Sequence, residues 1–141
     1  MEDMNRRTAM ALGLTVAAVT PLVALGTPAA AAMYGPEDGK EIMPGLRQVI
    51  IGEYPATFGG YAKVMVSDYI YAPGTAEPSS AMPNDMICQM VEGELLTKLR
   101  DEEESISKVG RVWTCAKGAL EQNTNQSDAF AVMRTFDLLP A

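Results

Sequence analysis

The sequence predicts an all-β sandwich or barrel. Short runs rich in β-branched, aromatic and other apolar residues recur along the chain, separated by turn signals about every ten residues. Beyond the N-terminal segment, no stretch shows the 3.6-residue apolar spacing that is typical of an amphipathic helix. The chain after this segment has about 109 residues, which is enough to bury one core and little more. These observations predict a single domain of the size of one small jelly roll.

The first 32 residues have the composition of a signal peptide. Arg6 and Arg7 precede a long, uncharged, alanine-rich segment that ends in small residues of the A-x-A type at Ala32. A charged start, an apolar middle and a small-residue end are typical of export signals. The paired arginines resemble the twin-arginine class, which exports folded proteins. Ala9 and Met10 stand where that class has a bulky apolar pair, so the ordinary secretory route stays open.

The alternative to cleavage is a retained membrane anchor, because about 20 apolar residues can span a bilayer. Gly13, Pro21 and Gly26 interrupt the segment, and its alanine content makes it only mildly apolar. We therefore expect cleavage near Ala32, a periplasmic or secreted protein, and no stable membrane insertion after cleavage.

The mature chain is expected to begin with an arm and then to run through strands. Residues 33–46 are rich in Gly, Pro and charge, which predicts an N-terminal arm that could cross to a partner chain. Residues 47–141 are the predicted β domain. Within it, residues 47–51 form a first strand, residues 53–60 turn the chain, and two sets of alternating side chains predict a longer strand over residues 61–71.

The remaining strands follow from apolar runs and the turns between them. Pro73-Gly74 and a Pro/Ser-rich loop precede one such run, and Gly93 closes it. The acidic residues 101–104 form the turn of a hairpin. Residues 122–128 carry side chains that stabilise turns, which predicts a loop there. The predicted strands cover residues 86–91, 94–99, 105–109, 112–116 and 129–139.

The mature domain is acidic. Beyond residue 32 the chain has 16 Asp and Glu against 9 Lys and Arg, which gives the same net charge of −7 as the whole chain. There is no basic cluster, so nucleic acid and anionic membrane surfaces would be repelled. Nucleophilic catalysis by a Ser-His or Cys-His pair finds no support, because the chain contains no histidine.

Two stretches of the sequence resemble the cupin superfamily. In the first, Pro73-Gly74 is followed by a strand that ends in Glu92-Gly93-Glu94-Leu95, which matches the frame of the family's first motif. In the second, Gly110, Gly118 and Asn125 match the frame of the second motif. The resemblance covers about the last half of the chain. It implies a double-stranded β-helix, or jelly-roll barrel, and a family in which domains commonly pair into dimers.

The metal ligands of that family are absent from this chain. The places of the first motif's two histidines and glutamate fall on Ser80, Met82 and Met86, and Glu121 occupies the place of the third histidine. The resemblance therefore implies the fold without the family's usual metal site.

If these positions point inward as they do in the family, strand alternation fills the barrel interior with sulfur, one indole and a few polar groups. The predicted ligand pocket is Ser80, Met82, Met86, Cys88, Met90, Trp113, Cys115, Glu121 and Asn125. One interpretation is a soft-metal site, because thiolate and thioether prefer ions such as Cu(I). We favour the other: methionine fills gaps in a core and free cysteine acts as a small apolar group. No metal or other cofactor is then expected.

Cys88 and Cys115 lie on strands that the family's arrangement places side by side. They would form a disulfide if their Cα atoms came within about 7 Å, and exported proteins occupy compartments where such bonds persist. The sequence leaves a disulfide and two free buried thiols equally open.

Glu121 is the candidate catalytic residue. Desolvation in an apolar cavity would let it act as a general acid or base near neutral pH, whereas at a solvated loop mouth it would be an ordinary carboxylate. Our leading interpretation is an exported module that binds a small molecule without catalysis. The alternatives are an enzyme that uses Glu121 or a soft metal, and a structural homodimer or accessory subunit.

Overall fold

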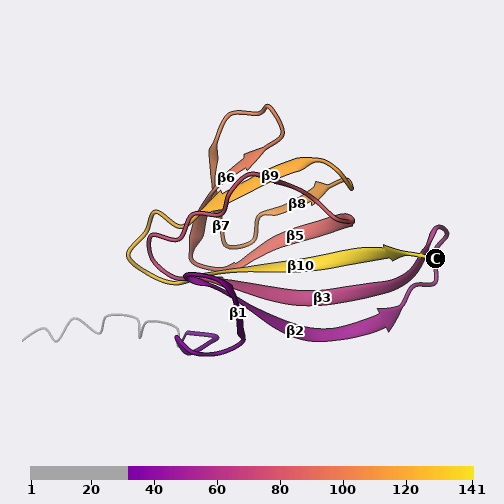
Figure 1. Cartoon of the computed structure of the whole chain (residues 1–141), viewed down its shortest axis with the longest axis horizontal. Helices are drawn as coiled ribbons and strands as arrows, with labels where there is room; N and C mark the ends of the chain where they lie inside the picture. The colour runs from indigo at the N-terminus through magenta and orange to yellow at the C-terminus, as the bar shows by residue number, and fades with distance from the viewer. Residues whose placement is uncertain (1–31) are drawn as a thin grey trace, which may run out of the picture. The chain divides into compact units, whose positions relative to one another are not determined.

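The computed structural model describes residues 32–141, which fold into two antiparallel β-sheets (Figure 1). The larger sheet has the strand order β1 (Lys40–Met43), β2 (Leu46–Pro55), β3 (Tyr61–Tyr71), β10 (Ala131–Pro140), β5 (Asp85–Glu92) and β8 (Val112–Cys115). The smaller sheet has the order β4 (Ser80–Ala81), β9 (Leu120–Thr124), β6 (Glu94–Leu99) and β7 (Ser105–Lys108). The all-β prediction is confirmed. The predicted signal peptide falls on residues 1–31, which lie outside the described residues, and on Ala32.

The core lies between the two sheets and results from strand alternation. Along β5, Met86, Cys88 and Met90 are buried, while the residues between them are more exposed. Leu95 and Leu99 contribute from β6 in the smaller sheet. The whole buried cluster is Leu46, Tyr71, Met86, Cys88, Met90, Leu95, Leu99, Trp113, Cys115, Ala131 and Met133. Sulfur side chains are thus a large part of the core packing.

The turn at Gly93 carries the chain from the larger sheet to the smaller one, between β5 and β6. Its φ of +67° is unfavourable for residues with a side chain. A Cβ atom at this position would also lie 2.6 Å from the carbonyl oxygen of Phe130. The glycine of the EGEL sequence is therefore required by both the backbone conformation and the close approach of β10.

The predicted N-terminal arm is in part a strand. Residues 40–43 form β1, which pairs with the start of β2 and so extends the larger sheet. Further toward the N-terminus, the hydroxyl of Tyr34 donates to a carboxylate oxygen of Asp68 on β3 at 2.7 Å. The arm therefore lies against its own chain. Pairing into a homodimer stays a prediction.

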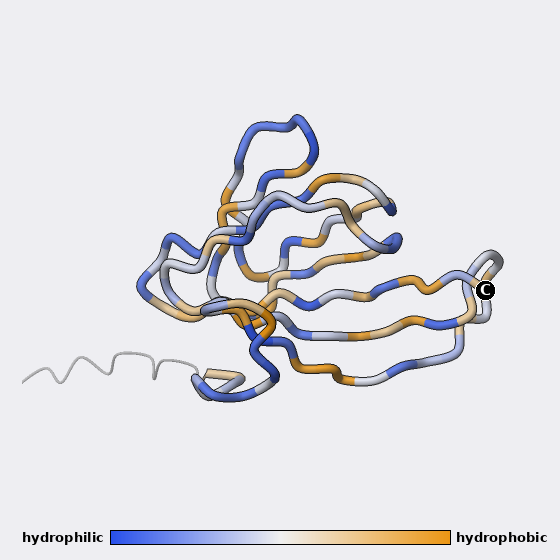
Figure 2. The backbone as a smooth tube through the Cα atoms, viewed as in Figure 1, coloured by the Kyte–Doolittle hydropathy of each residue, from blue (hydrophilic) through white to orange (hydrophobic). Residues whose placement is uncertain are grey.

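The prediction of a loop over residues 122–128 is wrong at its start, because β9 runs to Thr124. This strand pairs with β6 on one side and with the short β4 on the other. Asn123 and Glu121 are buried on its inner face, so hydrogen bonds inside the domain override the turn preference of the local sequence. The acidic residues 101–104 lie in the turn between β6 and β7, as predicted, and are exposed. Figure 2 shows this loop as one of the strongly hydrophilic parts of the backbone. Residues 32–141 contain no helix that is long and apolar enough to span a bilayer.

Candidate functional site

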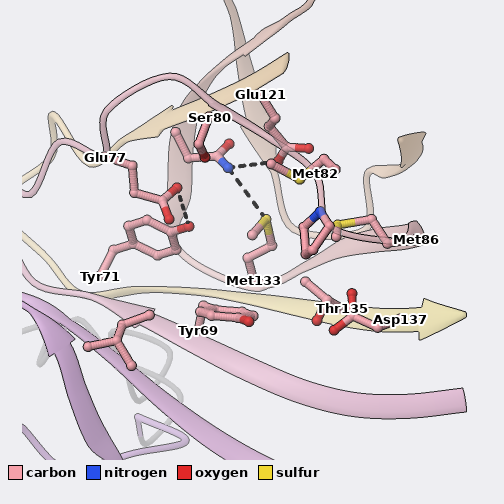
Figure 3. Close-up of a pocket in the computed structure, with 13 residues that line it drawn as sticks. Tyr69, Tyr71, Glu77, Ser80, Met82, Met86, Glu121, Met133, Thr135 and Asp137 are labelled. Atoms are coloured by element: carbon pink, nitrogen blue, oxygen red, sulfur yellow. Dashed lines mark hydrogen bonds between the residues drawn. The ribbon is translucent and has the colours of Figure 1, made fainter. Parts of the chain in front are cut away.

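A cavity of about 240 Å³ opens between the two sheets (Figure 3). Its lining is Ile42, Tyr69, Tyr71, Glu77, Ser80, Met82, Pro83, Met86, Glu121, Asn123, Met133, Thr135 and Asp137. Ile42, Ser80 and Pro83 are exposed and form the rim. The deeper part combines thioethers with carboxylates, hydroxyls and an amide, so it presents both an apolar and a polar surface to a guest.

Two strands supply most of the deep lining. On β10, alternation points Met133, Thr135 and Asp137 inward, and the register sets Asp137 opposite Met86 of β5. In the smaller sheet, β9 contributes Glu121 and Asn123, and β4 contributes Ser80 at the rim. Because β10 and β9 are regular strands, their polar groups are held on rigid backbone.

Three buried side-chain atoms in the described residues have no hydrogen-bond partner in the protein, and all three belong to this lining. They are Asn123 Oδ1, Thr135 Oγ1 and Asp137 Oδ1, on residues that are 2%, 2% and 5% exposed. An unpaired buried polar group costs about 1–3 kcal/mol, and most such groups in proteins are paired. Within residues 32–141, the buried side-chain N and O atoms without a partner therefore all belong to residues that line the cavity.

Glu121 is held by three internal donors. Its Oε2 accepts from the Cys115 thiol at 2.7 Å and from the Trp113 indole N–H at 3.5 Å, and its Oε1 accepts from Asn123 Nδ2 at 2.7 Å. Both oxygens are thus engaged with the protein. This arrangement favours a structural role for the carboxylate and removes support for Glu121 as a free acid or base.

Glu77 lines the cavity from the loop before β4, and the sequence prediction missed it. Its backbone N–H donates to the Asn123 carbonyl at 3.0 Å, which fixes this loop against β9. The Tyr71 hydroxyl donates to Glu77 Oε2 at 2.8 Å. Burial raises the pKa of the Glu77 carboxyl, and this outweighs the opposing effect of the Tyr71 hydrogen bond. No local signal places Glu77 inside, because its position depends on long-range pairing of the loop.

Asp137 was missed as well, although the sequence holds a signal for it. It lies in the predicted strand 129–139 and in phase with the apolar residues Ala131 and Met133, so it must share their inward face. Burial raises the pKa of its carboxyl. Burial of the Tyr69 phenol is the main cause that raises its pKa to about 12, and the charge of Asp137 is the second cause. Asp137 is the lining carboxylate with an unpartnered buried oxygen.

The structure brings some of the predicted pocket residues together and separates others. Ser80, Met82, Met86 and Glu121 line the cavity. The corrections concern five residues that do not line it: Cys88, Met90, Trp113, Cys115 and Asn125. The first four point inward, as predicted, but belong to the packed cluster between the sheets.

Asn125 has a structural role in the turn before β10. Its Nδ2 donates to the carbonyls of Tyr71 at 3.0 Å and Ala129 at 2.8 Å, and its Oδ1 accepts from the backbone and hydroxyl of Ser127. Asn125 is fully buried and all its polar atoms are used. It therefore fixes the loop and has no group left for a ligand.

Cys88 and Cys115 are both buried free thiols, so the disulfide alternative is not adopted. The register sets Cys88 opposite Trp113 and Cys115 opposite Met86, so the two cysteines are diagonal neighbours. Diagonal Cα atoms lie roughly 7–8 Å apart, beyond the usual disulfide range. Desolvation, then the hydrogen bond to Glu121 and its charge, raise the pKa of Cys115 to about 12, and burial raises the pKa of Cys88 even more.

The residues at the cupin ligand positions do not fit the metal of that family. They offer one hydroxyl, two thioethers and a carboxylate whose oxygens already accept from Cys115, Trp113 and Asn123. Within residues 32–141 no three Asp, Glu or Cys side chains gather as a metal-binding group. Hard and borderline ions select carboxylate, imidazole and water ligands. We therefore derive no chemistry through a metal here.

No model of a protein family matches the chain, and no curated protein is similar to it at the sequence level. Solved structures with the same fold are numerous. KdgF from Halomonas sp. is 16% identical, with a TM-score of 0.59 over 72% of this chain and 86% of that protein. A RmlC-like cupin from Shewanella frigidimarina is 17% identical, with a TM-score of 0.56 over 77% and 89% of the two chains.

A cupin superfamily protein from Desulfitobacterium hafniense adds a third match, at 13% identity and a TM-score of 0.53 over 72% of this chain and 83% of that one. Identities this low establish the fold alone. The domain is a cupin-like jelly roll, and the predicted double-stranded β-helix is confirmed.

Proposed function

We propose that this chain is an exported cupin-like module that binds a small molecule in the cavity between its sheets. One observation carries the proposal: the buried side-chain atoms without a partner, Asn123 Oδ1, Thr135 Oγ1 and Asp137 Oδ1, all belong to the lining of this cavity. A ligand with hydrogen-bond donors would satisfy them and recover the cost of their burial. The export of the protein rests on the composition of residues 1–32 alone.

The apolar part of the lining supports the same function. Met82, Met86 and Met133 contribute flexible, polarisable thioethers that adapt to the shape of a guest. A volume of about 240 Å³ is just below the 300 Å³ at which sites for drug-sized ligands begin. We therefore expect a compact molecule with one apolar and one polar end.

Two neighbouring serines offer a matched test. Ser79 and Ser80 are both exposed, but only Ser80 lines the cavity. The variant Ser80→Trp should close the mouth, whereas Ser79→Trp should leave it open. Compounds from a library of small amphipathic molecules that raise the melting temperature of the wild type should do the same for Ser79→Trp and not for Ser80→Trp.

The outcome against the proposal is equally clear. If no compound raises the melting temperature, or if the same compounds act equally on both tryptophan variants, the cavity is not a binding site. Retained folding of the two variants is checked by their far-ultraviolet circular dichroism.

A further inference from the structure

The cavity carries negative groups and no positive ones. Three carboxylates line it, those of Glu77, Glu121 and Asp137, and no Lys or Arg belongs to the lining. Clefts lined by one sign of charge concentrate ligands of the opposite sign. An anionic guest would meet three carboxylates without any compensating cation. Charge alone therefore favours a neutral or cationic guest.

The three unpartnered atoms, Asn123 Oδ1, Thr135 Oγ1 and Asp137 Oδ1, are hydrogen-bond acceptors. The Asn123 amide nitrogen donates to Glu121 Oε1 at 2.7 Å, and this fixes the orientation of the amide so that its Oδ1 is an acceptor. Asp137, when ionised, has only acceptors, and the Thr135 hydroxyl can accept as well. All three unsatisfied atoms are thus able to accept a hydrogen bond.

An ammonium group is the chemical complement of this surface. It has three N–H donors, no acceptor and a positive charge, while an alcohol has one donor and adds its own lone pairs. Its alkyl part would lie against Met82, Met86 and Met133, whose thioethers face the same space (Figure 3). The lining that is unfavourable in the free protein then becomes favourable in the complex.

We propose that the guest of this cavity is a short organic ammonium ion, whose N–H groups donate to the carboxylate of Asp137. This inference rests on the proposed binding function and specifies the class of ligand. It names Asp137, rather than Glu121, as the charged partner, since both Glu121 oxygens accept from the protein's own groups.

Three probes of the same size separate the chemical classes: butylammonium, butan-1-ol and butyrate. Their binding to the full chain is followed through the ¹³C-methyl signals of the methionines. Met82, Met86 and Met133 report on the cavity, while Met90 is buried in the core and does not line it. Butylammonium should shift the three cavity signals with an affinity at least about tenfold above that of butanol. Butyrate should leave them unchanged.

Asp137→Asn removes the charge and keeps the shape. The affinity for butylammonium should fall at least about tenfold, and that for butanol should change less than about threefold. Glu77→Gln is the matched control, because the Glu77 carboxylate already accepts from Tyr71. It should lower the butylammonium affinity by a smaller factor than Asp137→Asn.

A pH series of the wild type gives the same answer without a variant. Butylammonium keeps its charge over the range, as lysine does with a pKa of about 10.4. Because burial raises the pKa values of Asp137 and Glu77, these carboxyls take up protons at a higher pH than ordinary ones, so the butylammonium affinity should fall as the pH is lowered and the butanol affinity stay level. The charge of Asp137 acts on two other titratable groups, Tyr69 and Cys88, and Glu121 lines the same cavity. The phenol and the thiol stay neutral in this range, because burial raises both pKa values.

The outcomes distinguish this inference from the proposed function. If butanol or butyrate shifts the cavity signals as strongly as butylammonium, the ligand class is wrong and the binding function stands. If none of the three probes moves them at millimolar concentration, the ligand class is contradicted, and the library experiment with Ser79→Trp and Ser80→Trp decides the binding function. Equal loss of affinity for butylammonium and butanol in Asp137→Asn would show that the carboxylate shapes the cavity and does not pair with a cation.

Discussion

Two buried aspartates on neighbouring strands of the larger sheet have opposite surroundings. Asp68 on β3 is fully buried, and its oxygens accept from Arg134 Nε and Nη2, both at 2.8 Å, and from the Tyr34 hydroxyl at 2.7 Å. Asp137 on β10 is 5% exposed, and its Oδ1 has no partner. Asp68 points to the side away from the cavity, because the next residue, Tyr69, lines it.

The difference between the two shows where buried polar groups stabilise this domain and where they do not. Around Asp68 each charge has a partner, and burial, then the hydrogen bond to Asp68, raise the pKa of Tyr34 to about 12, so this phenol stays a donor. Such a closed network fixes the arm and β10 relative to β3. Around Asp137 the pairing rule is broken, as is expected at sites kept for function.

The largest effect is expected from breaking the paired side of this comparison. Asp68→Asn removes the charge that Arg134 and Tyr34 share, and it leaves a guanidinium that is 30% exposed without its partner. Removing one partner of a buried pair costs 3–5 kcal/mol, so we expect a loss near the lower end, about 3 kcal/mol. Urea unfolding measures it. The exposed Asp101→Asn should change the free energy of unfolding by less than about 0.5 kcal/mol, and a similar small value for Asp68→Asn would mean that the network is not stabilising.

The second effect concerns the paired carboxylate within the cavity. Glu121→Gln should cost about 2 kcal/mol, because the amide has one acceptor oxygen where the carboxylate has two, so either Cys115 and Trp113 or Asn123 loses its acceptor. Removing the charge should also lower the pKa of Cys115 from about 12, while desolvation still keeps it above the ordinary value. The rate of alkylation of Cys115 as a function of pH, in the Cys88→Ser background, reports this shift. An alkylation profile identical in both proteins would show that Glu121 and Cys115 do not interact.

The third prediction concerns Asp137, where the substitution is expected to increase the free energy of unfolding instead of lowering it. Since burial raises the pKa of Asp137, the folded state binds a proton more tightly than the unfolded state. Stability should therefore increase as the pH falls from neutral through the raised pKa. Asp137→Asn should gain about 0.5–1 kcal/mol at neutral pH, a figure reduced for the water that reaches the open cavity, and should show a weaker rise on acidification. The part that remains comes from Glu77.

Asp85 provides the control of opposite sign for this third prediction. Its pKa is lowered by the hydrogen bond from the Tyr61 hydroxyl and by that from the Lys117 backbone N–H. Its contribution to stability is present above the unfolded pKa and is lost as the pH falls through the folded pKa. Asp85→Asn should thus lose stability at neutral pH. If both asparagine variants respond to pH in the same direction, the contrast between the two environments is wrong.

Most strands of this fold could be predicted from the sequence because their signals are local. The predicted strand over residues 61–71 coincides with β3. The EGEL sequence ends β5 at Gly93, whose positive φ is unfavourable for any other residue. β9 could not be predicted in this way. Its Asn and Gln side chains favour turns in isolation, and only the pairing with β4 and β6, distant in the sequence, makes it a strand.

The residues of the candidate site also fall into two groups, those that local sequence signals predict and those that only long-range contacts place. Ser80, Met82, Met86 and Glu121 line the cavity because the motif spacing holds, even though the ligands of the resembled family are gone. Glu77 was beyond prediction, since its loop is placed by hydrogen bonds to β9. The lack of a hydrogen-bond partner for Asn123 Oδ1 and Thr135 Oγ1 could not be predicted either, because it depends on groups that are distant in the sequence.

The smallest effect is expected at the buried Thr135, and the buried Thr97 is its paired counterpart. Thr97 on β6 accepts from the Ser107 hydroxyl at 2.8 Å, whereas Thr135 Oγ1 has no partner. Thr97→Val should cost about 1–2 kcal/mol, because it leaves the Ser107 donor without its acceptor. Thr135→Val removes an oxygen whose burial is already uncompensated, so the free energy of unfolding should change by less than about 0.5 kcal/mol, or rise. Chemical denaturation of the two variants measures both changes. Equal losses of stability would mean that the Thr135 hydroxyl has a hydrogen-bond partner in the free protein. Thr135 Oγ1 would then no longer count among the three unpartnered atoms of the lining residues.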